Sequence, residues 1–312
     1  MNSKKFAQAS LAVGLSLTGY SVTAQESLKT GSQNLGAPEE GQRLPITFST
    51  GISHQLSSDV DIAGELDITG LSARVGIAFA INEDFTLVTA VNYELADYNF
   101  DKMKSPWSTV HTATVAPMLN YKVDEKWTIY GAPILRIAAE NGADVGDSIN
   151  GGGLIGANYM VSDTLTIGGG LGVISQIEDD ATLVPLLTGT WQFADAWKLQ
   201  AGFFDVATRG VGAQVLWDIN LDLQASFGAA MHKSRFRLDD SPRNKDGVGQ
   251  ESSTALFAKL AWRATENLTT EGFVGVAVGG EIRVEDKDGD RPFGTQTGKE
   301  DYDPAALLGL RA

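Results

Sequence analysis

The 312-residue chain contains no cysteine, which excludes a disulfide framework, a thiolate metal site and a cysteine nucleophile. No segment approaches the ~18 consecutive apolar residues of a membrane-spanning helix. Basic residues are scarce, because 24 Lys and Arg stand against 39 Asp and Glu, for a net charge of -15. A chain this acidic is a poor partner for nucleic acid. A membrane-spanning form of this chain must therefore cross lipid with strands.

The N-terminal residues have the composition of an export signal. Lys4 and Lys5 precede an apolar stretch, and small residues stand before Gln25, so residues 1–24 are predicted to be a secretory signal peptide. Its removal takes away two lysines and no acid, which moves the net charge from -15 to -17. Residues 25–45 are polar and aperiodic, and they are predicted to be a flexible periplasmic arm, with a short plug as the alternative.

One pattern recurs six times along the rest of the chain. Two apolar residues at positions i and i+2 are followed by a three-residue polar turn and then by another apolar residue. The predicted turns are NED (82–84), DEK (124–126), SDT (162–164), ADA (194–196), DIN (218–220) and TEN (265–267). Residues two apart share one face of a strand, so each copy predicts a tight hairpin with large apolar groups on one face. Six such hairpins predict a meander closed into a barrel.

The strand assignment follows from these turns. We expect fourteen strands, with twelve as the alternative, in one antiparallel up-and-down transmembrane β-barrel over residues 46–312. The expected strands are 46–56, 71–82, 84–98, 107–123, 125–139, 149–161, 163–177, 182–193, 195–207, 210–218, 220–236, 252–264, 266–284 and 304–312. The six tight turns then lie on the periplasmic side. The connections 57–70, 99–106, 140–148, 237–251 and 285–303 form outer loops, as in bacterial outer-membrane barrels.

Strand parity separates a lipid-facing face from a lumen-facing face. Charged residues fall consistently on the face opposite the large apolar groups, and an Arg or Lys facing lipid at midplane would cost about 2–4 kcal/mol. The predicted lumen-lining charges are Arg74, Glu94, Arg136, Lys198, Asp222, Lys259, Arg263 and Glu271. The predicted periplasmic aromatic girdle is Phe79, Phe85, Tyr121, Trp127, Tyr159, Trp191, Phe193, Trp197, Trp217 and Trp262.

Candidate catalytic and metal residues are few. His54, His111 and His232 fall on expected strands that are not neighbours, which disfavours an outer-membrane esterase, so no catalytic residue and no cofactor is predicted. Asp286, Asp288 and Asp290 alternate like the first ligands of an EF-hand loop. Arg291 and Thr297 stand where that loop needs Gly and Glu, so a solvated acidic loop is the default. Weak binding of a divalent cation by these acidic residues is the alternative, and calorimetric titration with calcium tests it.

Several stretches together resemble a known family. They are ISHQL, PWSTVH, NGGGLIGANYMVSDTLTIGGGLGVISQIEDDATLVPLLTGTWQF, KSRFRLDD with GVGQE, GGEIRVEDKDGD and DYDPAALLGLRA. They resemble a domain-of-unknown-function family of outer-membrane β-barrels in Gram-negative bacteria, over roughly residues 46–312. The resemblance implies a single-domain barrel in the outer membrane, and it implies no substrate, cofactor or catalytic residue.

The leading functional hypothesis is a passive pore for small solutes, or a structural barrel, in the outer membrane of a Gram-negative bacterium. A surface-binding or adhesion barrel is the alternative, an outer-membrane hydrolase is third, and a soluble β-sandwich remains open as another fold. The expected partners are outer-membrane lipid, lipopolysaccharide and the barrel assembly machinery. The sequence leaves the oligomeric state open.

The last expected strand lacks the terminal aromatic residue with which barrels of this family end. Leu308 and Leu310 begin the alternation, but the sequence stops at GLRA. We expect the native chain to continue for several residues beyond Ala312. Sequencing past the codon for Ala312 tests this expectation, and an immediate stop codon would contradict it.

Overall fold

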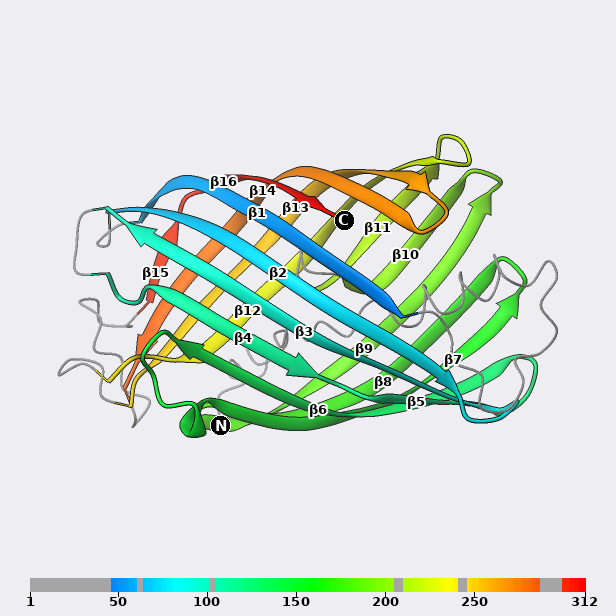
Figure 1. Ribbon diagram of the computed structural model, residues 1–312, viewed down its shortest axis with the longest axis horizontal. Coiled ribbons are helices and arrows are strands. Elements are labelled where there is room, and N and C mark those ends of the chain that lie inside the picture. Colours follow the sequence, from blue (N-terminus) through cyan, green and yellow to red (C-terminus); the bar gives the residue numbers. More distant parts are fainter. Residues whose placement is uncertain (1–45, 61–63, 102–104, 205–209, 241–245, 287–298) are drawn as a thin grey trace, which may run out of the picture.

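The computed structural model describes residues 46–60, 64–101, 105–204, 210–240, 246–286 and 299–312. These residues are almost entirely strand (Figure 1). The strands are β1 (Thr47–Val60), β2 (Gly64–Ala80), β3 (Phe85–Phe100), β4 (Thr109–Val115), β5 (Met118–Lys122), β6 (Trp127–Glu140), β7 (Ile149–Ser162), β8 (Leu165–Gln176), β9 (Asp179–Ala194), β10 (Trp197–Phe204), β11 (Gly210–Asp218), β12 (Leu223–Arg237), β13 (Val248–Thr265), β14 (Leu268–Glu285), β15 (Lys299–Tyr302) and β16 (Ala305–Arg311). A 3₁₀ turn, η1 (Gly146–Ser148), precedes β7.

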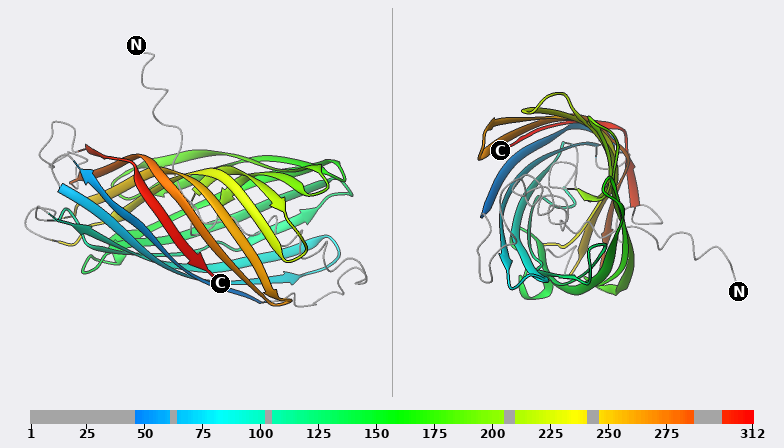
Figure 2. Two further views of the ribbon diagram at one scale, coloured as in Figure 1. Left: turned by 90° about the horizontal axis from the view of Figure 1, so that it is seen from above. Right: turned by 90° about the vertical axis from the view of Figure 1, so that its right-hand side faces the viewer.

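The strands form one closed antiparallel barrel, as expected from the sequence (Figures 1 and 2). Consecutive strands pair around the ring when β4 with β5, and β15 with β16, are each counted as one strand. β1 closes the ring by pairing with β15 and β16, which also pair with β14. The backbone groups of Thr50 and Ala312 exchange two hydrogen bonds, of 2.8 and 3.0 Å, at this closure. Closure leaves no free sheet edge along this part of the wall.

Two of the fourteen barrel strands are interrupted. The segments β4 and β5 together pair with β3 and β6, and Pro117 lies between them. Likewise β15 and β16 are separated at Pro304 and share the partners β1 and β14. Proline has no N–H to donate to a ladder, so each proline breaks the hydrogen-bond pattern without ending the strand. The count of fourteen therefore stands although sixteen strand segments are present.

The six turns predicted from the sequence lie at one end of the barrel, which we call the turn end. The other end is the loop end, where Ile177 and Glu178 alone join β8 to β9. At two turns an Asx side chain accepts hydrogen bonds from the next backbone N–H groups: Asn82 Oδ1 from Asp84 and Phe85, and Asp124 Oδ1 from Lys126 and Trp127. These two N–H groups hold the pKa of Asp124 below its usual value.

The fifth predicted turn is wrong by two residues. Asn220 Oδ1 accepts hydrogen bonds from the backbone N–H groups of Asp222 and Leu223, so the turn lies over 219–222 and β12 begins at Leu223. The prediction chose Asp218 as the first turn residue, but the capping amide is that of Asn220. Asp222 is consequently an exposed turn residue and does not lie on a strand of the barrel wall.

The exterior of the barrel carries an apolar band. Along β3 the odd-numbered residues Val91 and Tyr93 are exposed, while Val88, Ala90 and Asn92 on the other face are buried. The same alternation exposes large apolar residues around the ring, among them Leu119, Ile129, Ile155, Ile167, Leu171, Leu183, Leu187, Phe227, Leu256, Leu260, Val274 and Leu308. Such a band is what contact with lipid requires.

Toward the loop end the exterior face of the strands becomes polar and the interior face becomes apolar. Asp97 and Asn99 of β3 lie on the exterior, whereas Tyr98 and Phe100 point inward and are buried. The exterior there carries polar contacts, such as Asn99 Nδ2 to Asp67 Oδ2 at 2.8 Å. The strands thus continue beyond the apolar band as a water-facing wall with its own apolar core.

This change of polarity explains why the first outer loop was predicted too long. Residues 57–70 were assigned to a loop because they are rich in acidic residues, but β1 reaches Val60 and β2 begins at Gly64. The predicted signal peptide (1–24) and arm (25–45) lie outside the described residues. Within the described part, no helix is long and apolar enough to span a membrane.

The exterior band generates a stability prediction. Leu171 is half exposed in the middle of β8, so Leu171→Arg places a charge in lipid and should destabilise the folded barrel by about 2–4 kcal/mol. Denaturant unfolding in lipid vesicles measures this change. Glu125→Arg, in an exposed turn, is the control and should be close to neutral; equal stability of the two variants would show that the band does not contact lipid.

Candidate functional site

The interior of the barrel is the candidate site, and charged side chains line part of it. Lys198 Nζ lies 3.6 Å from Asp218 Oδ2, and Lys259 Nζ lies 3.8 Å from Glu271 Oε2. Lys259 also stands 5.2 Å above the Phe257 ring. Because both pairs are only partly buried, they are weak in energy and define the charge pattern of the wall rather than its stability.

The other predicted lining residues are spread around the ring. Arg74 on β2 is buried, Glu94 on β3 is half-buried, and Arg136 on β6 crosses the interior. Arg263 is exposed close to the turn end, where its backbone N–H bonds to the carbonyl of Asp222. Of the predicted lining charges, Lys259 thus pairs with Glu271, whereas Lys198 pairs with Asp218, which was not predicted to line the lumen.

A second interior surface is apolar. One cluster joins Val88 and Ala90 of β3 to Met118, Tyr130 and Ala132 of β5 and β6. A neighbouring cluster contains Ala116, Ile134 and Ile174. The β3–β8 part of the wall thus carries two apolar clusters beside Glu94 and Arg136. Gln200, Gln214 and the two charged pairs lie on β10–β14. The lining is asymmetric.

The loop end of the interior is closed by a packed apolar core. Trp107 is 1% exposed and makes edge-on contacts with Tyr98, Phe100 and Phe236, with ring centroids 5.6, 5.8 and 5.2 Å apart. The remaining members come from strands around the ring and are Val60, Leu66, Ala96, Val110, Ala138, Leu238, Ile282, Val284 and Tyr302. We call this cluster the outer core. It fills the interior near the loop end, where the interior face of the strands is apolar.

The outer end of β12 reaches across the interior to β6. In the ring these two strands are separated by β7–β11, yet Arg237 and Ala139 pair as parallel neighbours. Arg136 donates hydrogen bonds of 2.8 Å to the carbonyl of Arg235 and 3.3 Å to Ser234 Oγ. The wall therefore leans inward at this point, and β13 follows because its ladder with β12 continues to the pair Arg237 and Val248.

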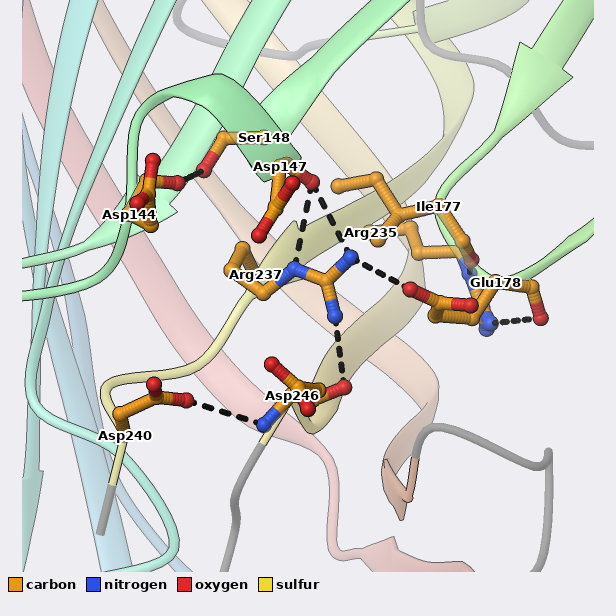
Figure 3. A network of polar contacts seen from close by, with 9 residues as sticks. All are labelled: Asp144, Asp147, Ser148, Ile177, Glu178, Arg235, Arg237, Asp240 and Asp246. Carbon is orange, nitrogen blue, oxygen red and sulfur yellow. Dashed lines mark hydrogen bonds and ion pairs between the residues drawn. The ribbon is translucent and has the colours of Figure 1, made fainter.

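Two buried arginines attach this leaning segment to η1 and to the turn between β8 and β9 (Figure 3). Arg237 donates to the carbonyl oxygens of Asp147 and Asp246 and to Glu178 Oε1 at 2.7 Å. Arg235 donates to the carbonyl oxygens of Ile177 and Glu178 and to Glu285 Oε2 at 2.8 Å. Charge-assisted bonds of this kind are roughly twice as strong as neutral ones, so a few side-chain contacts are enough to hold the segment in this position.

Sequence reasoning missed this arginine network. Arg235 and Arg237 share strand parity with the exposed Met231, so the alternation places them on the exterior surface. The available signal was two arginines at the end of a strand on its apolar parity, where lipid contact is costly. Their carbonyl partners cannot be recognised from the sequence, because any residue supplies a carbonyl.

The histidines lie in separate surroundings. His54 Nδ1 is 3.0 Å from Thr69 Oγ1, and His111 Nδ1 is 2.7 Å from Tyr93 OH. His232 lies inside, with Nε2 3.0 Å from Glu251 Oε2. Glu251 also accepts a 2.8 Å hydrogen bond from Tyr302 OH. The structure thus brings no two histidines together, and the Glu251–Tyr302 contact is a further feature that sequence reasoning missed.

The remaining predicted residues are placed as follows. Girdle aromatics lie next to one another at the turn end: Phe85 stacks on Tyr121 at 4.6 Å, Trp127 lies 4.6 Å from Tyr159, and Trp197 stacks on Trp217 at 5.4 Å. Asp286 follows β14, while Asp288 and Asp290 lie outside the described residues. Among described residues no group of three potential metal ligands occurs.

No family model matches the chain, and no curated protein matches it. Solved structures do match. An outer-membrane channel from Pseudomonas putida F1 is 10% identical, with 89% of this chain and 98% of that chain covered and a TM-score of 0.43. A Pseudomonas aeruginosa FadL homologue is 11% identical (85% and 89% covered, TM-score 0.44), and so is the Ralstonia pickettii toluene transporter TbuX (89% and 90%, 0.41).

These likenesses concern the fold alone, and no functional argument rests on them. The barrel predicted from the sequence is confirmed by the chain's own strand pairing. The resemblance of the sequence to a domain-of-unknown-function family is not supported by a matching family model, and it stays a prediction.

Proposed function

We propose that this protein is an outer-membrane channel for small solutes, with its turn end facing the periplasm. The observation that supports this proposal most is that one closed barrel has an apolar exterior band and an interior with ion pairs and amide side chains. A barrel with that division is stable in lipid while its lumen is wet. Neither property would be needed by a soluble sandwich.

Strand number supports a channel of limited width. Eight-stranded barrels are filled by side chains, and barrels of 16 to 18 strands leave an aqueous channel. Fourteen strands fall between these cases. Glycines such as Gly156, Gly168 and Gly170 do not widen the interior, because neighbouring side chains or backbone occupy the space that a Cβ would take. The proposed lumen is narrow, so solutes pass close to the charged and apolar walls.

The interior charges give the channel an ion preference that can be measured. In planar bilayers the purified protein should show discrete conductance steps, even if they are brief. Lys259→Ala removes a cation from the wall and leaves Glu271 without this partner, so the reversal potential in a salt gradient should shift toward cation preference.

Leu260→Ala is the matched control, because Leu260 is the next residue and faces the exterior. Its reversal potential should equal that of the wild type. Conductance steps with no shift for Lys259→Ala would remove Lys259 from the ion path, and silence of every variant at all voltages would contradict a channel.

A further inference from the structure

Among the described residues, the ladder of β11 on β12 stops before the outer end of β12. The β11 ladder on β12 runs from Asp218 opposite Gln224 to Val211 opposite Met231, and β11 begins at Gly210. β12 continues to Arg237, and its last residues have β13 as backbone partner on one side. On the other side, the backbone ladder gives way to the arginine contacts and the single bridge to β6.

Side-chain contacts are easier to exchange than a strand ladder. A continuous ladder must be broken over many residues before a strand moves. Among the described residues, the β11 side of the outer end of β12 is attached through Arg136, Arg235 and Arg237. Segments of this kind belong to the low-stability end of a structure. The segment that packs into the outer core thus has, as far as the structure describes its surroundings, a single backbone bridge beyond Met231 on its β11 side.

Two contacts of Arg237 lie at strained backbone. Glu178 has φ of 49° and Asp246 has φ of 54°, and among the described residues they alone combine a positive φ with a side chain. Glu178 accepts from Arg237 through its carboxylate, and Asp246 through its carbonyl. Strained residues persist only where their surroundings hold them, and they gather at switching and binding elements. One arginine therefore holds both strained positions.

From these contacts, and resting on the channel function proposed above, we propose that the outer parts of β12 and β13 form a gate with Arg237 as its latch. The gate comprises Ser234–Leu238 and Val248–Glu251. In the closed state it leans into the interior, with Phe236 against Trp107 and Arg237 on Glu178 of the β8–β9 turn. Release of Arg237 relaxes Glu178 and Asp246, frees the β12 edge and opens the loop end of the channel.

The first experiment removes the latch. Arg237→Gln should raise the open probability of single channels on the order of tenfold, because the closed state loses its charge-assisted bonds. Amide hydrogen exchange should accelerate similarly in Ser234–Leu238 and Val248–Glu251 but not in residues 223–231, which keep their β11 ladder. The control is Asp147→Asn, since Arg237 contacts the carbonyl of Asp147 and not its carboxylate.

A second variant replaces the latch by a bond that can be made and broken. Arg237 and Ala139 are paired residues, and the chain has no cysteine, so Ala139→Cys with Arg237→Cys forms a unique pair. Reduced protein should conduct like Arg237→Gln, and oxidised protein should be closed. The control is Ala201→Cys with Ala213→Cys, paired within the β10–β11 ladder, whose conductance should ignore the redox state.

The outcomes separate the gate from the channel. Equal open probability in wild type, Arg237→Gln and both redox states would overturn the gate and leave the channel function standing. Faster exchange in the gate with no conductance in any variant would support the latch and overturn the channel function. Unchanged exchange in Arg237→Gln, or an oxidised pair that conducts as well as the reduced one, would overturn the latch.

Discussion

Every backbone N–H and C=O group that crosses lipid must find a partner inside the protein, and the whole structure depends on this requirement. The chain meets it by closing fourteen strands into a ring, with the joint made where β1 meets β14 through β15 and β16. Closure fixes which face of each strand sees lipid and which sees the interior. The exterior band, the charged lining and the outer core all follow from that one geometric choice.

Features with a short sequence period could be predicted. Parity separates Val91 and Tyr93 from Ala90 and Asn92 without knowledge of any long-range contact, because successive residues of a strand face opposite ways. Turns were found because polar residues interrupt that alternation. The fifth was displaced because both Asp218 and Asn220 are suitable turn residues, and only the hydrogen bonds of Asn220 decide between them.

The loop end could not be predicted, because its contacts join residues far apart in the chain. Arg136 and Arg235 are 99 residues apart, and nothing in either local sequence indicates the other. The acidic residues between 57 and 70 were assigned to a loop because a lipid-facing strand cannot carry them. Beyond the apolar band the same strands face water, so acidic residues such as Asp59 and Glu65 become acceptable on the exterior, and Val60 and Leu66 enter the outer core.

At the outer end of β12, side-chain contacts take over from the backbone hydrogen-bond ladder with β11. Where the described part of β11 ends, Arg136 donates to the backbone carbonyl of Arg235. Arginine side chains of β12 in turn bind carbonyl oxygens of η1 and of the β8–β9 turn, namely those of Asp147, Ile177 and Glu178. The substitution is local: the β12–β13 and β13–β14 ladders continue to Val248 and Glu285. The outer end of β12 is therefore bound by a backbone ladder on its β13 side and by side-chain contacts on its β11 side.

The central claim is that the barrel closes its own loop end by leaning β12 onto β6. Spin labels at Asn141, just after β6, and Asp240, just after β12, test this directly by pulsed electron resonance in lipid, since both positions are exposed and suited to labelling. The closed barrel predicts a short distance, because Gly142 and Asp239 are in close contact at this point and Asp239 N donates to Glu140 Oε2 at 3.0 Å. A single distance population near the full diameter of the barrel would contradict the account.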